Sequence, residues 1–144
     1  MAFFEYSYLP AIMIVTDSIC VSLEMAKKLA KAGWPQLDSL FIVMDDGEIR
    51  YRAIQLTDES GNMTGTCFAA PTAEEILRNM PEIIKQQDGL KEFIYFQNVY
   101  RSRGNFCVAY YTLRDMEQVV DLEDESLANA AASCWCYLKE NNLL

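Results

Sequence analysis

Apolar and polar positions in the first third of the chain change from the pattern of a strand to that of a helix. Residues 11–15 form a short, partly β-branched apolar run, which predicts a buried strand. Apolar residues then recur at helical spacing after Ser22, whose hydroxyl can accept a hydrogen bond from the first helical turn. Gly33 is expected to end this helix, and Trp34 to fold back onto its apolar side.

Two pairs of β-prone runs predict two hairpins. The first pair is 40–44 and 49–56, with a glycine-containing turn between the two runs. The second pair, 93–100 and 106–113, is rich in aromatic and β-branched residues. Its turn, 101–105, carries two arginines and is therefore basic.

The segments that follow each hairpin predict loops and two further helices. Residues 57–71 are rich in Gly, Ser, Thr and Asn, which favours a long exposed loop. Thr72–Glu75 has the spacing of a capping box and predicts a short helix that Pro81 ends at the latest. Residues 115–125 predict an acidic connection, and Ser126 can cap a final helix with an apolar stripe.

Together these elements predict one α+β domain covering residues 1–144. We expect the N-terminal strand and the two hairpins to form an antiparallel sheet of about five strands, with about three helices packed on it. The chain is 51% hydrophobic over 144 residues, which is enough for a core without a disulfide or a metal. No repeat, low-complexity tract or linker divides the sequence.

The protein is acidic, with 21 Asp and Glu against 12 Lys and Arg and a net charge of −9. Such a chain repels nucleic acid polymers and anionic membranes, so an anionic ligand requires a local group of cations. The five cysteines have no CxxC spacing, which indicates reduced thiols and a cytoplasmic location. The N-terminal apolar segment has no basic region and is too short to span a membrane, so neither a signal peptide nor an anchor is expected.

The sequence carries no motif of a known catalytic mechanism. It has no histidine and lacks a phosphate loop, GxGxxG, GxSxG, HExxH and EF-hand spacing. We therefore predict a non-enzymatic protein without a cofactor. The acidic residues between Asp115 and Glu125 follow no calcium-loop pattern, which favours a solvated connection over a metal site.

The distribution of arginine indicates a candidate ligand site. Five of the six arginines belong to the two predicted hairpins or flank them, whereas most lysines lie on predicted helices. If the hairpins are neighbours, arginine forks can hold phosphate oxygens while a tyrosine ring stacks on a base, which suits a small phosphorylated ligand. The candidate ligand-binding residues are Arg50, Arg52, Arg101, Arg103, Tyr110 and Tyr111.

Two other interpretations of these residues stay open. The arginines could solubilise one face of a sheet and pair with nearby acids, while the tyrosines pack across strands. The same surface could instead contact another protein, because Tyr and Arg are enriched at interface hot spots and edge strands invite pairing. Self-association into a homo-oligomer is therefore expected.

Three blocks of sequence carry a resemblance to a protein family. They are residues 21–29 with 32–36, residues 70–77, and residues 126–131 with 135–141. These blocks, which cover the three predicted helices, resemble small proteins of tailed phages and prophages that have no established catalytic residues. Asn142 stands where that family commonly has glycine.

The resemblance implies a phage accessory protein that counters a host defence by binding. One mode is the sequestration of a nucleotide-type signal in the arginine and tyrosine pocket. The other is the blockade of a host protein by the acidic surface, which can mimic the charge of nucleic acid. A structural or housekeeping role in the phage is the remaining alternative.

We expect the double variant Arg101→Ala/Arg103→Ala to lose binding of a nucleotide ligand while its fold stays intact. A thermal-shift screen against cyclic dinucleotides, cyclic ADP-ribose isomers and NAD checks this, because a ligand at 100 times its Kd stabilises the folded state by about 2.7 kcal/mol. Unchanged affinity in the double variant would contradict the site assignment.

Overall fold

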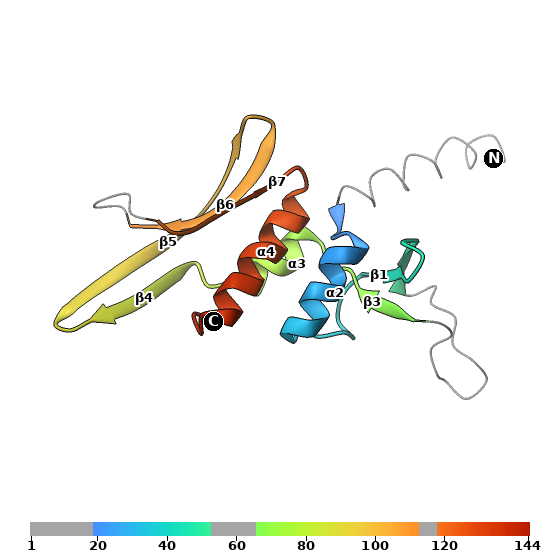
Figure 1. Ribbon diagram of the computed structural model, residues 1–144, viewed down its shortest axis with the longest axis horizontal. Helices are drawn as coiled ribbons and strands as arrows, with labels where there is room; N and C mark the ends of the chain where they lie inside the picture. Colours follow the sequence, from blue (N-terminus) through green and yellow to red (C-terminus); the bar gives the residue numbers. More distant parts are fainter. Residues whose placement is uncertain (1–18, 53–65, 113–117) are drawn as a thin grey trace. The chain divides into compact units, whose positions relative to one another are not determined.

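The computed structural model describes residues 19–52, 66–112 and 118–144 (Figure 1). The chain forms two compact units, Met1–Thr72 and Ala73–Leu144. The strand expected at residues 11–15 lies outside the described residues. Whether the two units form the single domain expected from the sequence stays a prediction.

The first unit contains a helix and a three-stranded antiparallel sheet. Its elements are α2 (Leu23–Ala32), β1 (Phe41–Met44), β2 (Ile49–Tyr51) and β3 (Cys67–Ala69). The strand order is β2-β1-β3, and α2 packs against β1 and β3. β1 and β2 are paired from Phe41↔Tyr51 to Val43↔Ile49, which confirms the first predicted hairpin.

The ends of α2 follow the predicted capping chemistry. The hydroxyl of Ser22 accepts a hydrogen bond from the backbone N–H of Met25. Gly33 has φ of 100°, the left-handed conformation that ends helices and that side chains disfavour. The buried Trp34 donates its backbone N–H to the carbonyl of Leu29, so the chain turns back over the end of α2 as expected.

The segment predicted as a long exposed loop ends in a strand, which corrects that prediction. β3 pairs with β1 from Ile42↔Ala69 to Met44↔Cys67. Ala69 and Pro71 are buried, so this part of residues 57–71 belongs to the core of the unit. β3 has only three residues, which is too short to show an alternation of apolar and polar positions in the sequence. The polar residues before it therefore favoured a loop.

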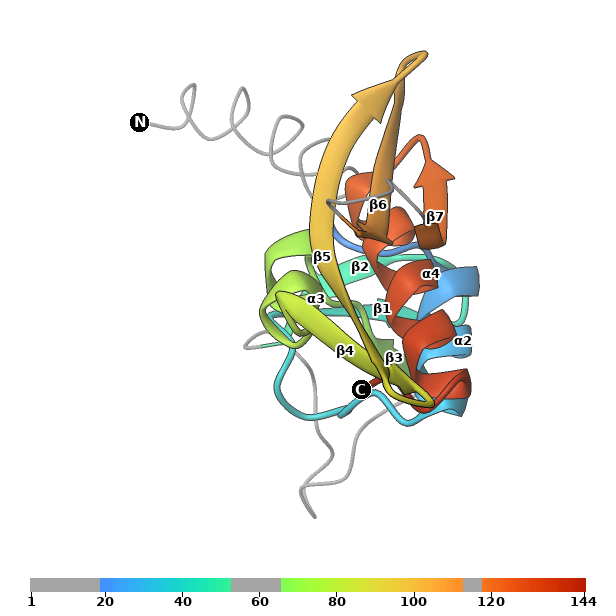
Figure 2. The same ribbon diagram turned by 90° about the vertical axis from the view of Figure 1, so that its left-hand side faces the viewer.

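The second unit is a four-stranded antiparallel meander with two helices (Figures 1 and 2). The elements are α3 (Ala73–Arg78), β4 (Ile83–Asp88), β5 (Lys91–Ser102), β6 (Asn105–Tyr111), β7 (Gln118–Asp124) and α4 (Leu127–Glu140). The strand order β4-β5-β6-β7 follows the sequence. The second predicted hairpin is confirmed by β5 and β6, and α4 begins after Ser126, whose hydroxyl accepts from the N–H of Asn129.

The prediction of one sheet with about five strands is wrong, because the described residues form seven strands in sheets of three and four. Two strands of the second unit were missed. β4 has only two apolar residues, at its start. β7 lies in the predicted acidic connection, where Val120 is buried while the adjacent Asp121 is exposed. Asp121 and Glu123 occupy the solvent-facing positions of this half-buried strand, whereas Asp124 alternates onto the face of Val120 and is partly buried.

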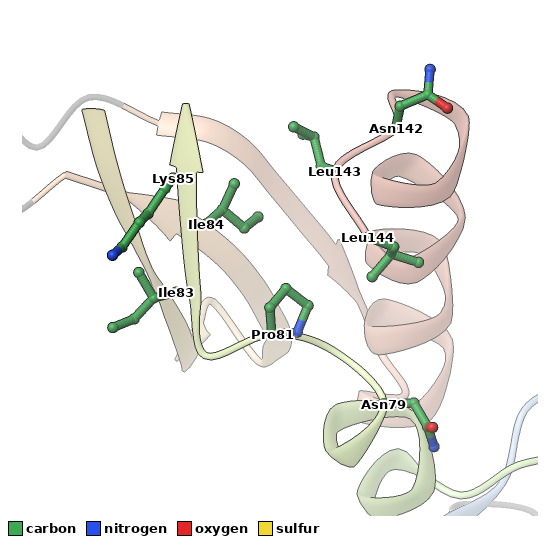
Figure 3. Close-up of a pocket in the computed structure, with 8 residues that line it drawn as sticks. All are labelled: Asn79, Pro81, Ile83, Ile84, Lys85, Asn142, Leu143 and Leu144. Carbon is green, nitrogen blue, oxygen red and sulfur yellow. The ribbon is translucent and has the colours of Figure 1, made fainter. Parts of the chain in front are cut away.

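The long helix α4 covers one face of the sheet in the second unit. The side chain of Ile84 points toward α4 (Figure 3), and its neighbours on that face include the buried Tyr95 and Tyr110. α4 packs against β6, β7 and α3. Four alanines of α4 are fully buried, and such small side chains allow a close approach to the strands. We call the opposite side of this sheet the outer face.

The N-cap of α4 provides a test of this packing. Ser126→Ala should lower the free energy of unfolding by about 1 kcal/mol, because the N–H of Asn129 loses its side-chain acceptor. Ser126→Asp, which restores an acceptor, should unfold at nearly the wild-type urea concentration. Urea titrations followed by far-UV circular dichroism measure both, and equal stability of all three proteins would contradict the role of the cap.

Candidate functional site

Arg50 and Arg52 of the predicted ligand site lie in the first unit and have local partners. Arg50 Nη2 lies 2.8 Å from Glu48 Oε2, and this hydrogen-bonded ion pair raises the pKa of Arg50. Arg52 donates from Nε to the carbonyl of Ser39 at 2.7 Å and from Nη2 to the carbonyl of Gln36 at 2.5 Å. The Arg52 guanidinium therefore ties the end of the β1–β2 hairpin to the segment that follows α2.

Arg101 and Arg103 lie at the tip of the β5–β6 hairpin in the second unit. Both side chains are exposed, and Arg103 has φ of 53° in the turn. The guanidinium of Arg101 lies 4.8 Å from the ring centroid of Phe106, its cross-strand partner. Among the described residues, neither arginine forms an ion pair.

Tyr110 is part of the core of the second unit. Its side chain is fully buried, its hydroxyl donates to the carbonyl of Pro81, and it accepts from Gln97 Nε2 at 3.1 Å. Burial raises the pKa of Tyr110 to about 12. In this conformation its ring has no face open for stacking on a base.

The six predicted residues are distributed over two units and two sheets. Tyr110 lies four residues along β6 from Phe106, which pairs with Arg101, so about 14 Å of strand separates the tyrosine from the arginine tip. Tyr111 is partly exposed and belongs to the outer face, opposite Phe96. Because Arg50 and Arg52 belong to the other unit, the convergence of all six residues stays a prediction.

The outer face carries a group of polar contacts that the sequence did not reveal. Tyr100 donates its hydroxyl to Asp121 Oδ2 at 2.6 Å, and Gln118 Nε2 donates to the same oxygen at 3.3 Å. Glu123, one row nearer the hairpin tip, lies beside the thiol of Cys107, with 4.0 Å between Sγ and Oε2. The hydrogen bond to Asp121 raises the pKa of Tyr100, because the bond favours the protonated phenol.

Apolar side chains extend the outer face toward β4. Ile83 and Ile94 are 44% and 40% exposed, and the partly exposed Phe96 and Tyr111 lie between them and the acidic residues. The sequence signal for this face is the spacing of two residues along a strand. It places Ile94 and Phe96 on one face of β5, and Asp121 and Glu123 on one face of β7. That signal identifies a face only once the strand β7 is recognised.

A pocket of about 380 Å³ lies between β4 and the residues that follow α4 (Figure 3). Apolar side chains form its walls together with two amide side chains and a lysine. The lining residues are Asn79, Pro81, Ile83, Ile84, Lys85, Asn142, Leu143 and Leu144.

The described ranges contain no group of three or more Cys, Asp or Glu side chains that could hold a metal ion. None of the described helices is both long enough and apolar enough to cross a membrane.

Comparison with known proteins gave no relative. The chain matches no protein-family model, no curated protein and no solved structure.

The burial of Tyr110 predicts a loss of stability at alkaline pH. The pKa of Tyr110 is raised to about 12 in the folded protein, whereas an unfolded tyrosine titrates near 10. Its contribution is therefore complete below about pH 10 and is lost as the pH rises toward 12.

Tyr110→Phe should unfold more easily at pH 7 by about 1 kcal/mol, because the carbonyl of Pro81 loses its donor. The variant should also lose less stability than the wild type between about pH 10 and 12. Urea titrations at pH 7 and at several alkaline pH values measure both effects. Parallel pH profiles of the two proteins would contradict the buried position of this hydroxyl.

Proposed function

We propose that this chain is a non-enzymatic binding protein that docks on a cationic surface of a partner protein through the outer face. The observation that carries the proposal is the combination of an exposed apolar area with carboxylates in fixed positions. Ile83 and Ile94 supply the apolar area, and the hydrogen bond between Tyr100 and Asp121 holds one carboxylate in place.

Interface energetics support this reading of the outer face. Tyrosine rings contribute large contact areas at a low cost in conformational entropy, and they are enriched among interface hot spots. Asp121 and Glu123 lie next to them and are exposed, so a partner's arginine or lysine can approach both carboxylates. The net charge of −9 strengthens the attraction of a cationic partner at long range.

We propose a host protein in the bacterial cytoplasm as the partner, following the resemblance to phage and prophage proteins. Sequestration of a nucleotide-type signal has less support from the geometry. Arg50 is paired with Glu48, and Arg52 donates to backbone carbonyls. Among the described residues, Arg101 and Arg103 are therefore the two predicted arginines with no polar partner. Tyr110 is buried and has no ring face open for a base.

Outer-face variants test the proposal against a matched control. Ile94→Asp introduces a charge into the apolar area of the outer face, and Leu37→Asp introduces the same charge at a 76% exposed position in the first unit. In quantitative pull-downs from bacterial lysate, Ile94→Asp should recover the specific partner at least tenfold less well than the wild type. Leu37→Asp should recover it normally.

The carboxylates are tested separately with Asp121→Asn/Glu123→Gln, which preserves the size of both side chains and an acceptor for Tyr100. Partner recovery should fall with this variant and with rising salt, because exposed charge pairs are screened. Equal recovery by all four proteins would contradict docking through the outer face.

A further inference from the structure

The edge strand β4 presents backbone groups that no strand of the described sheet uses. The N–H of Gln97 donates to the carbonyl of Glu82 at 2.9 Å, which identifies these opposed residues as a hydrogen-bonded pair. Such pairs alternate with non-bonded pairs along antiparallel strands, so Ile84, Gln86 and Asp88 also bond to β5. The intervening Ile83, Lys85 and Gln87 therefore direct their N–H and C=O groups away from the sheet.

The pocket beside β4 lies where a side chain of an added strand would enter. Ile84 points into the pocket together with Pro81, Leu143 and Leu144, whereas Ile83 and Lys85 point to the other side (Figure 3). A residue placed opposite Ile84 on an added strand would share its face and enter the 380 Å³ space. The far wall is held in place, because the N–H of Leu143 donates to the carbonyl of Leu138 at 2.8 Å.

We propose that β4 binds an extended segment of a partner protein by antiparallel strand addition, with a large apolar residue of that segment in the pocket. The N–H and C=O groups at Ile83, Lys85 and Gln87 provide the main-chain bonds, and the pocket provides the selectivity, as in other cases of strand addition. This inference uses a site separate from the acidic residues of the outer face and does not depend on them.

The charge of Lys85 specifies the residue next to the apolar anchor. Lys85 is exposed, is the single cation of β4 and forms no ion pair among the described residues. Its cross-strand partner on β5 is Ile94, which leaves the ammonium group available. In an antiparallel addition the residue that precedes the anchor lies opposite Lys85, so the partner segment carries Asp or Glu directly before its large apolar residue.

Lys85 also disfavours a second copy of this chain as the occupant. In a symmetric antiparallel pairing of two β4 strands through Ile83, Lys85 and Gln87, Lys85 lies at the centre. Its ammonium group is then opposite the Lys85 ammonium group of the other copy. Like charges in this position destabilise a strand pair, and lysine on an edge strand is a common protection against self-pairing.

Synthetic peptides test the proposal directly. The probe is the labelled heptapeptide Thr-Val-Glu-Leu-Thr-Val-Thr, together with forms that have Ile, Met or Phe in place of Leu, and binding is measured by fluorescence polarisation. At least one of these peptides should bind with a Kd below about 1 mM, and replacing Glu by Lys should weaken binding at least tenfold. Glu lies opposite Lys85 and the Thr directly after Leu lies opposite Ile83, so N-methylation of these two peptide residues should abolish binding. N-methylation of the two valines, whose N–H groups point away from β4, should be tolerated.

Two variants of the protein test the edge and the pocket, and a third serves as the control. Lys85→Pro removes an open N–H that β5 does not use, so this variant should stay folded and lose binding at least tenfold. Leu144→Ser changes the pocket wall at a 47% exposed position and should also weaken binding. Asp121→Asn/Glu123→Gln should bind the peptide normally, which distinguishes this site from the proposed docking through the outer face.

Three results would overturn the proposal. They are the absence of binding by every peptide, equal binding by both N-methylated forms, and a concentration-dependent dimer of the wild type that Lys85→Pro abolishes in sedimentation experiments. The last result would assign the edge to a second copy of the chain.

Discussion

The hydroxyl of Tyr110 joins three parts of the second unit. It donates to the carbonyl of Pro81 in the connection between α3 and β4, and it accepts from Gln97 on β5. Its ring is fully buried on the face that α4 covers. Because a buried hydroxyl without partners is costly, this arrangement fixes where the chain leaves α3 and therefore where β4 begins along β5.

The surfaces that we assign to binding follow from this one-sided arrangement. α4 covers one face of the sheet and α3 packs against α4, so the outer face keeps Tyr100, Asp121 and the exposed isoleucines accessible. The meander also ends at β4, so among the described residues no further strand pairs with the open N–H and C=O groups of that strand. The outer face and the edge of β4 are therefore the two surfaces for which we propose binding.

The local signals in the sequence were sufficient for the helix ends and for both hairpins. Ser22 and Ser126 accept the hydrogen bonds expected of N-caps, and Gly33 ends α2 as predicted, in the left-handed conformation. The strands β4 and β7 escaped detection, because the exposed positions of a half-buried strand are polar and dilute the apolar pattern. The error in the strand count followed from these two strands and from the short β3.

The candidate ligand site was harder to predict than the fold, because side-chain roles depend on contacts between distant segments. The sequence shows that Arg52 and Tyr110 are chemically able to bind a nucleotide. It does not show that Arg52 is bonded to the carbonyls of Ser39 and Gln36, or that Tyr110 is buried. The sequence could not predict the outer face either, because the contact between Tyr100 and Asp121 joins β5 and β7, which are not adjacent in the sheet.

Amide hydrogen exchange along β4, measured residue by residue by NMR, tests most directly the claim that this unit leaves one sheet edge open. The account predicts slow exchange at Ile84, Gln86 and Asp88, whose N–H groups face β5, and fast exchange at Ile83, Lys85 and Gln87. Equal protection of the two sets of amides would contradict it, because the edge would then be covered already.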